Sequence, residues 1–158
     1  MKFAAFILTF AFFVMPKCMA ANGIAVTGNG TNSALNLTAN FSGAVANVTE
    51  TFDTSSKPTY IVSAFSANAG LKNGASVVPY TVSYACAAAV STTVTISTMD
   101  QQIASRYNPP SASSCTGTIS ISFSGAAASQ LYQGTYSDNI TFSYRRNGSL
   151  VSTQALTL

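Results

Sequence analysis

The sequence has 158 residues, of which only 7% are charged and none is histidine. Without histidine there is no Ser-His-Asp or Cys-His catalytic arrangement, and the commonest zinc ligand and general base is missing. Seven basic and four acidic residues give a net charge of +3, too small for the basic stripe that nucleic-acid binding requires. The composition therefore argues against an enzyme and against a nucleic-acid partner.

The first twenty residues are typical of a secretory signal peptide. Lys2 provides a short basic start, and the run from Phe3 to Met15 is apolar. Cys18 and Ala20 then place small residues where a signal peptidase cleaves. The apolar run is shorter than the roughly 20 residues that a membrane-spanning helix needs. We expect cleavage after Ala20 and export of the remaining chain.

Alternation of apolar and polar residues predicts an all-β mature chain without a long helix. After a flexible extension over residues 21–34, a single domain is expected over residues 35–158. Strands are expected at residues 35–42, 44–52, 59–67, 78–86, 90–96, 115–123 and 136–144. Strands of this number, each with one polar face, predict an immunoglobulin-like antiparallel β-sandwich, with a small closed barrel as the alternative.

Two cysteines, Cys86 and Cys115, remain in the mature chain, and each is in phase with the apolar residues of its strand. An even pair in an exported protein most simply forms one disulfide bond. Both sulfurs should point into the core, where a bridge between strands is geometrically allowed. Two unpaired buried thiols are the alternative.

The acidic residues of the mature chain are scattered, so they predict no catalytic pair. Hydrolysis by paired carboxylates would require two of Glu50, Asp53, Asp100 and Asp138 to converge from distant strands. Glu50 and Asp53 are expected at a solvated strand end and turn. The segment Gly28–Gly30 precedes no helix and is expected to be flexible rather than a phosphate loop. We therefore expect no catalytic residue, no cofactor and no metal site.

Three segments resemble strands of bacterial chaperone–usher pilins. The stretch Gly134–Tyr144 resembles the last strand of these subunits, above all in the archaic, spore-coat-U-like branch: Gly, x, Tyr, x, Asp, then apolar residues alternating with Thr or Ser, ending in Tyr. The segment Val77–Tyr84 is similar to the mid-chain strand with a Pro-aromatic pair. The alternating segment Ala34–Phe41 resembles the donor strand of colonisation-factor pilins.

The resemblance implies an incomplete sandwich with an apolar groove beside its last strand. A periplasmic chaperone fills such a groove first, and a strand from another subunit replaces it later. Donor-strand candidates are Leu35, Leu37, Ala39 and Phe41, and groove candidates on the last strand are Tyr136, Ile140, Phe142 and Tyr144. Leu35 to Phe41 can also be read as an ordinary first strand, with Ile24 and Val26 as donor instead.

The same resemblance implies the function, partners and location of the chain. It implies a structural subunit of a surface pilus that contributes to adhesion or biofilm. The expected partners are other pilus subunits, a periplasmic chaperone, an outer-membrane usher and a host or surface receptor. Export would run through the inner membrane to the periplasm and then to the cell surface.

The chain departs from the pilin pattern after Tyr144, where the family commonly ends. The turn chemistry of Arg146–Ser149 predicts a hairpin, and Leu150–Leu158 should return as a strand antiparallel to the preceding one. A strand that fills the edge would make the domain self-sufficient. That outcome favours the alternative function, a self-contained secreted binding module or tip adhesin; a coat or matrix protein is a third alternative.

Overall fold

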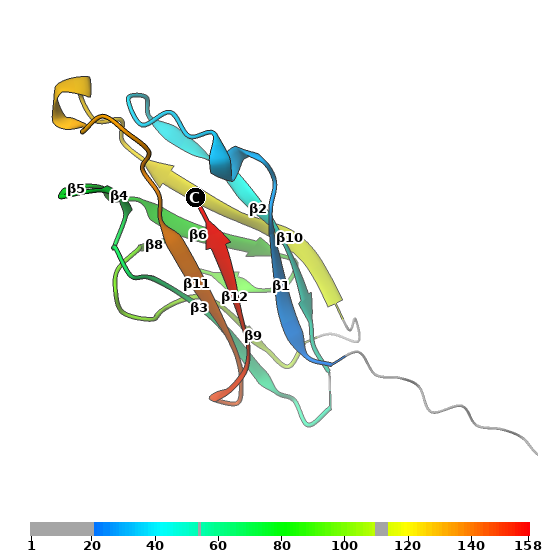
Figure 1. The fold of residues 1–158 in the computed structure, drawn as a ribbon. Helices are drawn as coiled ribbons and strands as arrows, with labels where there is room; N and C mark the ends of the chain where they lie inside the picture. Colours follow the sequence, from blue (N-terminus) through cyan, green and yellow to red (C-terminus); the bar gives the residue numbers. More distant parts are fainter. Residues whose placement is uncertain (1–20, 54, 110–113) are drawn as a thin grey trace, which may run out of the picture.

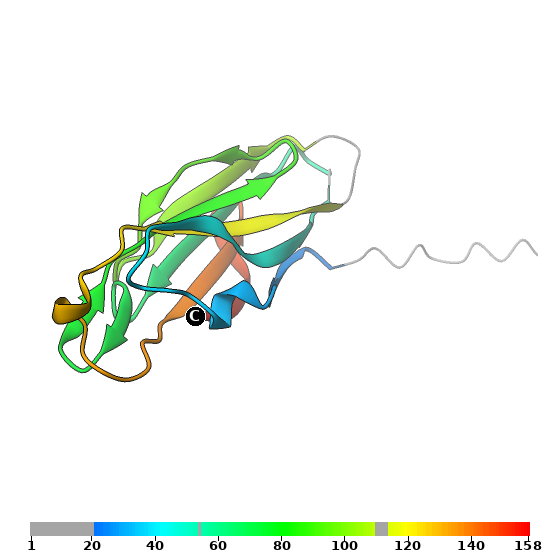
Figure 2. The same cartoon turned by 90° about the horizontal axis from the view of Figure 1, so that it is seen from above.

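The computed structural model describes residues 21–53, 55–109 and 114–158; the expected signal peptide, residues 1–20, lies outside the described residues. The described chain forms two five-stranded antiparallel sheets packed face to face (Figures 1 and 2). The predicted immunoglobulin-like β-sandwich is confirmed.

Sheet A contains the first strand of the domain and sheet B the last one. In order across sheet A lie β1 (Gly23–Gly28), β2 (Phe41–Thr51), β10 (Ser114–Phe123), β6 (Thr81–Cys86) and β8 (Val94–Thr95). In order across sheet B lie β12 (Ser149–Thr157), β11 (Asn139–Arg146), β3 (Thr59–Ser66), β9 (Gln101–Tyr107) and β7 (Val90–Ser91). A small hairpin joins β4 (Leu71–Asn73) to β5 (Ser76–Val78), and the short 3-10 helices are η1 (Thr31–Ser33) and η2 (Ala128–Gln130).

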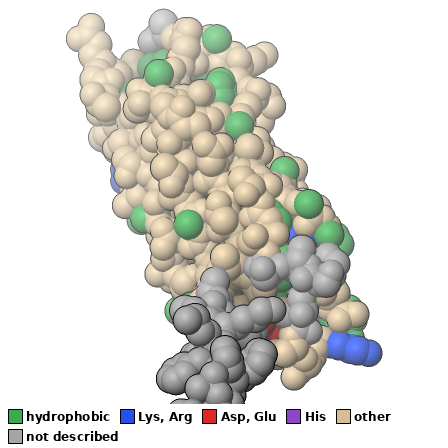
Figure 3. Space-filling view, turned by 90° about the vertical axis from the view of Figure 1, so that its right-hand side faces the viewer, with side chains coloured by type: hydrophobic (Ala, Val, Ile, Leu, Met, Phe, Trp, Pro, Cys, Tyr) green, Lys and Arg blue, Asp and Glu red, His purple; other side chains and the backbone are tan. Residues whose placement is uncertain are grey.

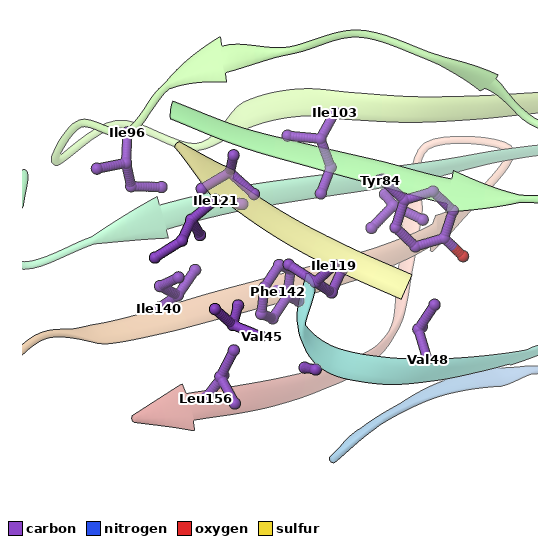
Figure 4. Packing of buried hydrophobic residues seen from close by; sticks show 14 of the residues in the cluster. Val45, Val48, Tyr84, Ile96, Ile103, Ile119, Ile121, Ile140, Phe142 and Leu156 are labelled. Carbon is purple, nitrogen blue, oxygen red and sulfur yellow. The ribbon is translucent and has the colours of Figure 1, made fainter. Parts of the chain in front are cut away.

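The core lies between the two sheets and follows the period-two pattern of the strands. In a strand, alternate side chains point to opposite faces, so one set enters the interior. Figure 4 shows this packing for Val45, Val48, Tyr84, Ile96, Ile103, Ile119, Ile121, Ile140, Phe142 and Leu156. The intervening residues of β10 include Thr116, Thr118 and Ser120, and the face drawn in Figure 3 is largely uncharged. The sequence pattern therefore accounts for both the core and the neutral surface.

The strands β1 and β12 lie side by side along one side of the sandwich and run in the same direction (Figure 1). The amide of Ile24 donates to Ser152 Oγ at 3.2 Å. Further along, Asn32 Nδ2 donates to the carbonyl of Thr157 at 3.0 Å, so η1 lies beside the C-terminus in Figures 1 and 2. The two terminal strands thus close the same side of the sandwich, one from each sheet.

The N-terminal region differs from the expected arrangement. Residues 23–28 form β1 instead of belonging to a flexible extension, and β2 begins only at Phe41. The expected strand over residues 35–42 is therefore absent up to Asn40. Asn36 Oδ1 accepts from the backbone N–H and the hydroxyl of Thr38, at 3.0 and 2.8 Å. Such a local side-chain turn competes with a strand, which explains why the alternation is not extended here.

Two further differences concern the middle of the chain. Strand β9 was not expected, although it pairs with β3 along most of its length. The expected strand over residues 90–96 is split into β7 and β8, which lie in different sheets. Strand β9 carries few apolar residues that could alternate, and β7 and β8 have only two residues each, so the pairing of all three is decided mainly by their partners.

Candidate functional site

The position beside β11, where the resemblance implies an open groove, is occupied by the chain's own β12. The two strands pair antiparallel from Asn139 with Thr157 to Arg146 with Ser149. Beyond the strand end, Asp138 and Leu158 exchange two backbone hydrogen bonds, at 3.3 and 2.9 Å. The predicted C-terminal strand is confirmed, and it covers the whole edge of β11.

The groove candidates on the last strand do not share one environment. Ile140, Phe142 and Tyr144 are completely buried in the core between the sheets. Tyr136 precedes β11 and is half-buried, with its hydroxyl 2.8 Å from Ser76 Oγ and from the amide of Tyr132. Three of the four candidates therefore lie together on β11, whose edge β12 covers, and the fourth lies at the end of the sandwich.

The strand that covers these residues has a half-polar inner face. Leu156 and Leu158 are buried, but Ser152 and Gln154 are only half-buried, and the outward Val151 is exposed. Burial of a polar side chain against an apolar surface stabilises the fold less than burial of an aliphatic side chain of similar size. The first half of β12 therefore contributes less to the closure of the sandwich than its second half.

The donor-strand candidates are spread along an irregular segment. Leu35 and Leu37 are half-buried, whereas Ala39 is exposed. Phe41 begins β2, and its ring stacks on that of Phe123 with the centroids 5.5 Å apart. The structure does not bring these four side chains together on one face.

Leu35 and Leu37 instead line a groove of about 850 Å³ at one end of the sandwich. The opposite wall is the loop before β11, and the groove begins where β12 ends. Its apolar surface comes from Leu35, Leu37, Leu71, Leu131 and Leu158, and its polar groups are neutral amides and hydroxyls. No Lys, Arg, Asp or Glu side chain is among the described residues that line it, so the groove suits neutral ligands.

Glu50 was expected to be solvated, and that expectation is wrong. Glu50 is 1% exposed, and Arg106 Nη2 donates to its Oε2 at 3.1 Å. The hydroxyls of Tyr84 and Tyr144 donate to the two carboxylate oxygens at 3.0 and 3.1 Å. Burial, followed by the charge of Glu50, raises the pKa of both tyrosines. Both carboxylate oxygens of Glu50 therefore have hydrogen-bond partners. The network links β2, β6, β9 and β11 and leaves no unpaired carboxylate for acid–base chemistry.

The predicted disulfide bond joins Cys86 to Cys115, with the Cα atoms 6.1 Å apart. Both residues lie in sheet A, on the neighbouring strands β6 and β10. Gly117 faces Cys86, and a Cβ atom there would overlap the carbonyl of Ala85. Glu50 lies close to both sulfurs, but a bonded pair of sulfurs offers no thiolate to a metal.

The aspartate of the pilin-like segment, Asp138, has a structural role. Its carboxylate accepts from Tyr80 at 2.6 Å and from Ser66 at 2.5 Å, and also from the amide of Asn139 at 2.8 Å. Asp138 is 2% exposed. It connects the segment between β5 and β6 to β3 and to the start of β11, and so fixes the end of the sandwich at which the groove lies.

A second polar cluster, the Asp53 cluster, holds the start of β1. It consists of Asp53, Tyr60 and Arg146, which come from three separate segments, and it binds Asn22 just before β1. Asn22 Nδ2 donates to Asp53 Oδ2 at 3.0 Å, and the amide of Asp53 donates to Asn22 Oδ1 at 2.7 Å. Arg146 Nη2 lies 3.0 Å from Asp53 Oδ1. The hydrogen bond from Asn22 is the main cause that lowers the pKa of Asp53.

No helix among the described residues is long and apolar enough to span a membrane. The sequence matches no family model, and no curated protein matches it. One solved structure is similar at low score: the CssB subunit complemented with a donor strand from the CssA subunit, from the colonization factor CS6 of enterotoxigenic Escherichia coli. The TM-score is 0.41 at 12% identity, and the alignment covers 85% of this chain and 93% of that chain.

Proposed function

We propose that this protein is a structural subunit of a bacterial surface fibre, whose copies are joined by exchange of a strand near the N-terminus. One observation carries the proposal: β1 and β12, the terminal strands, lie side by side on one side of the sandwich. A terminal strand from a neighbour can enter such a side without any loop having to be threaded.

The surface chemistry is compatible with assembly. Only 7% of all residues are charged, and the groove beside β12 is neutral. Low charge removes the repulsion that keeps most soluble proteins apart. Because the inner face of β12 is half polar, the contact between β12 and β1 is less apolar than the rest of the core. Both features favour a protein that associates through this side.

Two stretches near the N-terminus are candidate donors. One is β1 itself, with Ile24 and Val26 facing inward. The other is the alternating set of Leu35, Leu37, Ala39 and Phe41, for which the receiving groove would be formed by Ile140, Phe142 and Tyr144 after β12 leaves. An exported subunit of this kind would meet a periplasmic chaperone and an outer-membrane usher before reaching the surface.

The test is the association state of residues 21–158 purified from a bacterial periplasm. A strand-exchanging subunit should form oligomers that resist detergent at room temperature and dissociate on heating. Size-exclusion chromatography, unheated detergent gels and electron microscopy would detect them. A protein that stays monomeric at millimolar concentration, with and without partial unfolding and refolding, would contradict the proposal.

A second function, a self-contained binding module, is favoured by the complete pairing of β12 with β11. A sandwich closed by its own last strand needs no neighbour for stability. The neutral groove at the end of the sandwich would then be its ligand site. Monomeric behaviour, together with saturable binding of a neutral ligand that is lost in a Leu37→Asp variant, would support this function over the first.

A further inference from the structure

We infer that the strand passing between copies is β1, and that the Asp53 cluster is the site that receives its first residues. The partner is a second copy of this chain, so the inference rests on the proposed fibre function. It assigns the exchange to the edge of sheet A beside β2, and not to the position beside β11 that β12 occupies.

The receiving site belongs entirely to the body of the domain. Asp53, Tyr60 and Arg146 lie on the segment after β2, on β3 and on β11, and none of them is part of β1. Three hydrogen bonds of 2.7–3.2 Å hold the Asn22 side chain, two with Asp53 and one with the Tyr60 hydroxyl. Arg146 in turn pairs with Asp53. Thr51 Oγ1 adds a bond to the carbonyl of Ala21 at 2.9 Å. The same groups can bind the first residues of another copy with identical contacts.

Strand β1 has backbone pairing along only one edge. It pairs with β2 from Gly23 with Thr51 to Gly28 with Ala46. On its other side, the amide of Ile24 bonds a side chain of β12 instead of the β12 backbone. The apolar contribution of β1 is confined to Ile24, which is buried, and Val26, which is half-buried. A short edge strand of this kind separates before the rest of the sandwich.

The connection after β1 is long enough to reach a neighbour. It runs from residue 29 to residue 40, because β1 ends at Gly28 and β2 begins at Phe41. Two adjacent antiparallel strands usually need a loop of about 2–5 residues. Twelve extended residues span about 40 Å, roughly the length of a small domain. The surplus length allows β1 to leave its own body without strain in β2.

Exchange also accounts for the unused alternation of Leu35, Leu37 and Ala39. In the closed chain this stretch is irregular, although its sequence is that of a strand. When the connection is drawn out between two copies, it can become extended and pair with the facing copy. Exchange would therefore replace the turn at Asn36 by a regular strand, while β1 keeps the same contacts.

The experiment uses the register of β1 on β2. Ala25 faces Thr49 on the outer side of sheet A, and both residues are exposed. In the variant Ala25→Cys/Thr49→Cys, a disulfide bond between the two positions forms within one chain if β1 pairs with β2 of its own chain. It forms between two chains if β1 is exchanged. Oligomers are formed first, oxidised, denatured and run on a gel without reductant. The native Cys86–Cys115 bond lies within one chain and produces no ladder.

We expect most chains of the oligomer to migrate as covalent dimers and longer ladders. Cross-linked monomers within genuine oligomers would overturn the β1 assignment and leave the fibre function standing. Absence of oligomers under all conditions would overturn both. The single variant Ala25→Cys is the control for random cross-linking, because it lacks the facing thiol. Asn22→Ala should reduce the ladder at least tenfold, whereas Ser91→Ala, an exposed position on β7 at the far edge of sheet B, should leave it unchanged.

Discussion

Arg106 crosses the interior of the sandwich from β9 to meet Glu50 on β2, with Nη2 3.1 Å from Oε2 and both side chains 2% exposed. The guanidinium carbon also lies 4.6 Å from the centre of the Phe52 ring. A buried pair of this kind adds little net stability over apolar residues, but removal of one partner leaves a buried charge alone. The two residues therefore behave as one unit.

Arg106→Met should lower the free energy of unfolding by about 3–5 kcal/mol, because Glu50 would lose its cation. The double variant Arg106→Met/Glu50→Gln should lose less than the sum of the two single variants. Urea unfolding measures all three. Arg145→Met is the control, since its pair with Asp100 is partly exposed at 3.9 Å and should contribute less than about 1 kcal/mol. Additive losses would contradict the coupling.

Removal of the disulfide bond should destabilise the domain without changing its fold. Cys86 and Cys115 are 29 residues apart, and closing a loop of that length in the unfolded chain contributes about 3.5 kcal/mol in the chain-entropy treatment. The variant Cys86→Ala/Cys115→Ala should lose that amount in urea unfolding. Alkylation of the oxidised wild-type protein in denaturant should label neither residue. A urea midpoint equal to that of the wild type would contradict the estimate.

The Asp53 cluster predicts a loss of stability in acid. The pKa of Asp53 is lowered in the folded state, first by the hydrogen bond from Asn22 and also by Ser55 and Arg146. A group with a lowered folded pKa stabilises the protein above its unfolded pKa, near 3.9, and that contribution disappears as the pH falls through the folded value.

The melting temperature of the wild type should therefore fall more steeply below pH 4 than that of Asp53→Asn. Asp100→Asn is the matched control, because its carboxylate forms only a partly exposed ion pair with Arg145, at 3.9 Å, within the described part of the chain. Its melting temperature should follow the wild type across the whole range. Equal acid profiles for Asp53→Asn and the wild type would show that the cluster does not contribute.

Removal of β12 should leave the domain unable to fold stably alone. A chain that ends at Arg146 exposes the core side of Ile140 and Phe142, both of which are fully buried. Addition of a peptide of residues 149–158 should restore cooperative melting. For a smaller change, Leu156→Ala should cost about 2–3 kcal/mol because it opens a core cavity. Val151→Ala, on the exposed face, should cost less than about 0.5 kcal/mol.

Leu37→Asp separates the two candidate donor segments. If β1 is exchanged, oligomers should still form, because Leu37 is only half-buried in the connection between β1 and β2. Ile24→Asp should prevent oligomers, because it places an unpaired charge in the buried position of β1. Loss of oligomers in Leu37→Asp together with normal assembly of Ile24→Asp would identify Leu35–Phe41 as the donor.

The sequence predicts those parts of the fold whose chemistry is local. The β11–β12 hairpin follows from Asn147 and Gly148, which both have positive φ, 49° and 84°, as a tight two-residue turn requires. The alternation in β10 and β11 identifies their buried faces, and the two cysteines share that phase. These features need no information about distant residues.

The missed features depend on partners far along the chain. Glu50 is in phase with Val48 and Phe52, which is the one signal that it points inward, but its partner Arg106 is 56 residues away. The strand expected over residues 35–42 fails because a turn at Asn36 competes with it. β1 was not expected because its two apolar residues form a strand only on the edge of β2. Which N-terminal segment is the donor strand depends on its contacts with distant strands, so the alternation of apolar and polar residues alone does not identify it.

The parallel course of β1 and β12 determines how the domain carries a mechanical load. Asn22 contacts the Asp53 cluster beside the hairpin where β12 begins, and Asn32 contacts Thr157 where β12 ends. A pull between the start of β1 and the end of β12 is therefore directed along both strands. The hydrogen bonds of β1 to β2 and of β12 to β11 would be sheared together instead of being opened one after another. We expect the closed domain to resist tension along its strands far better than tension across them.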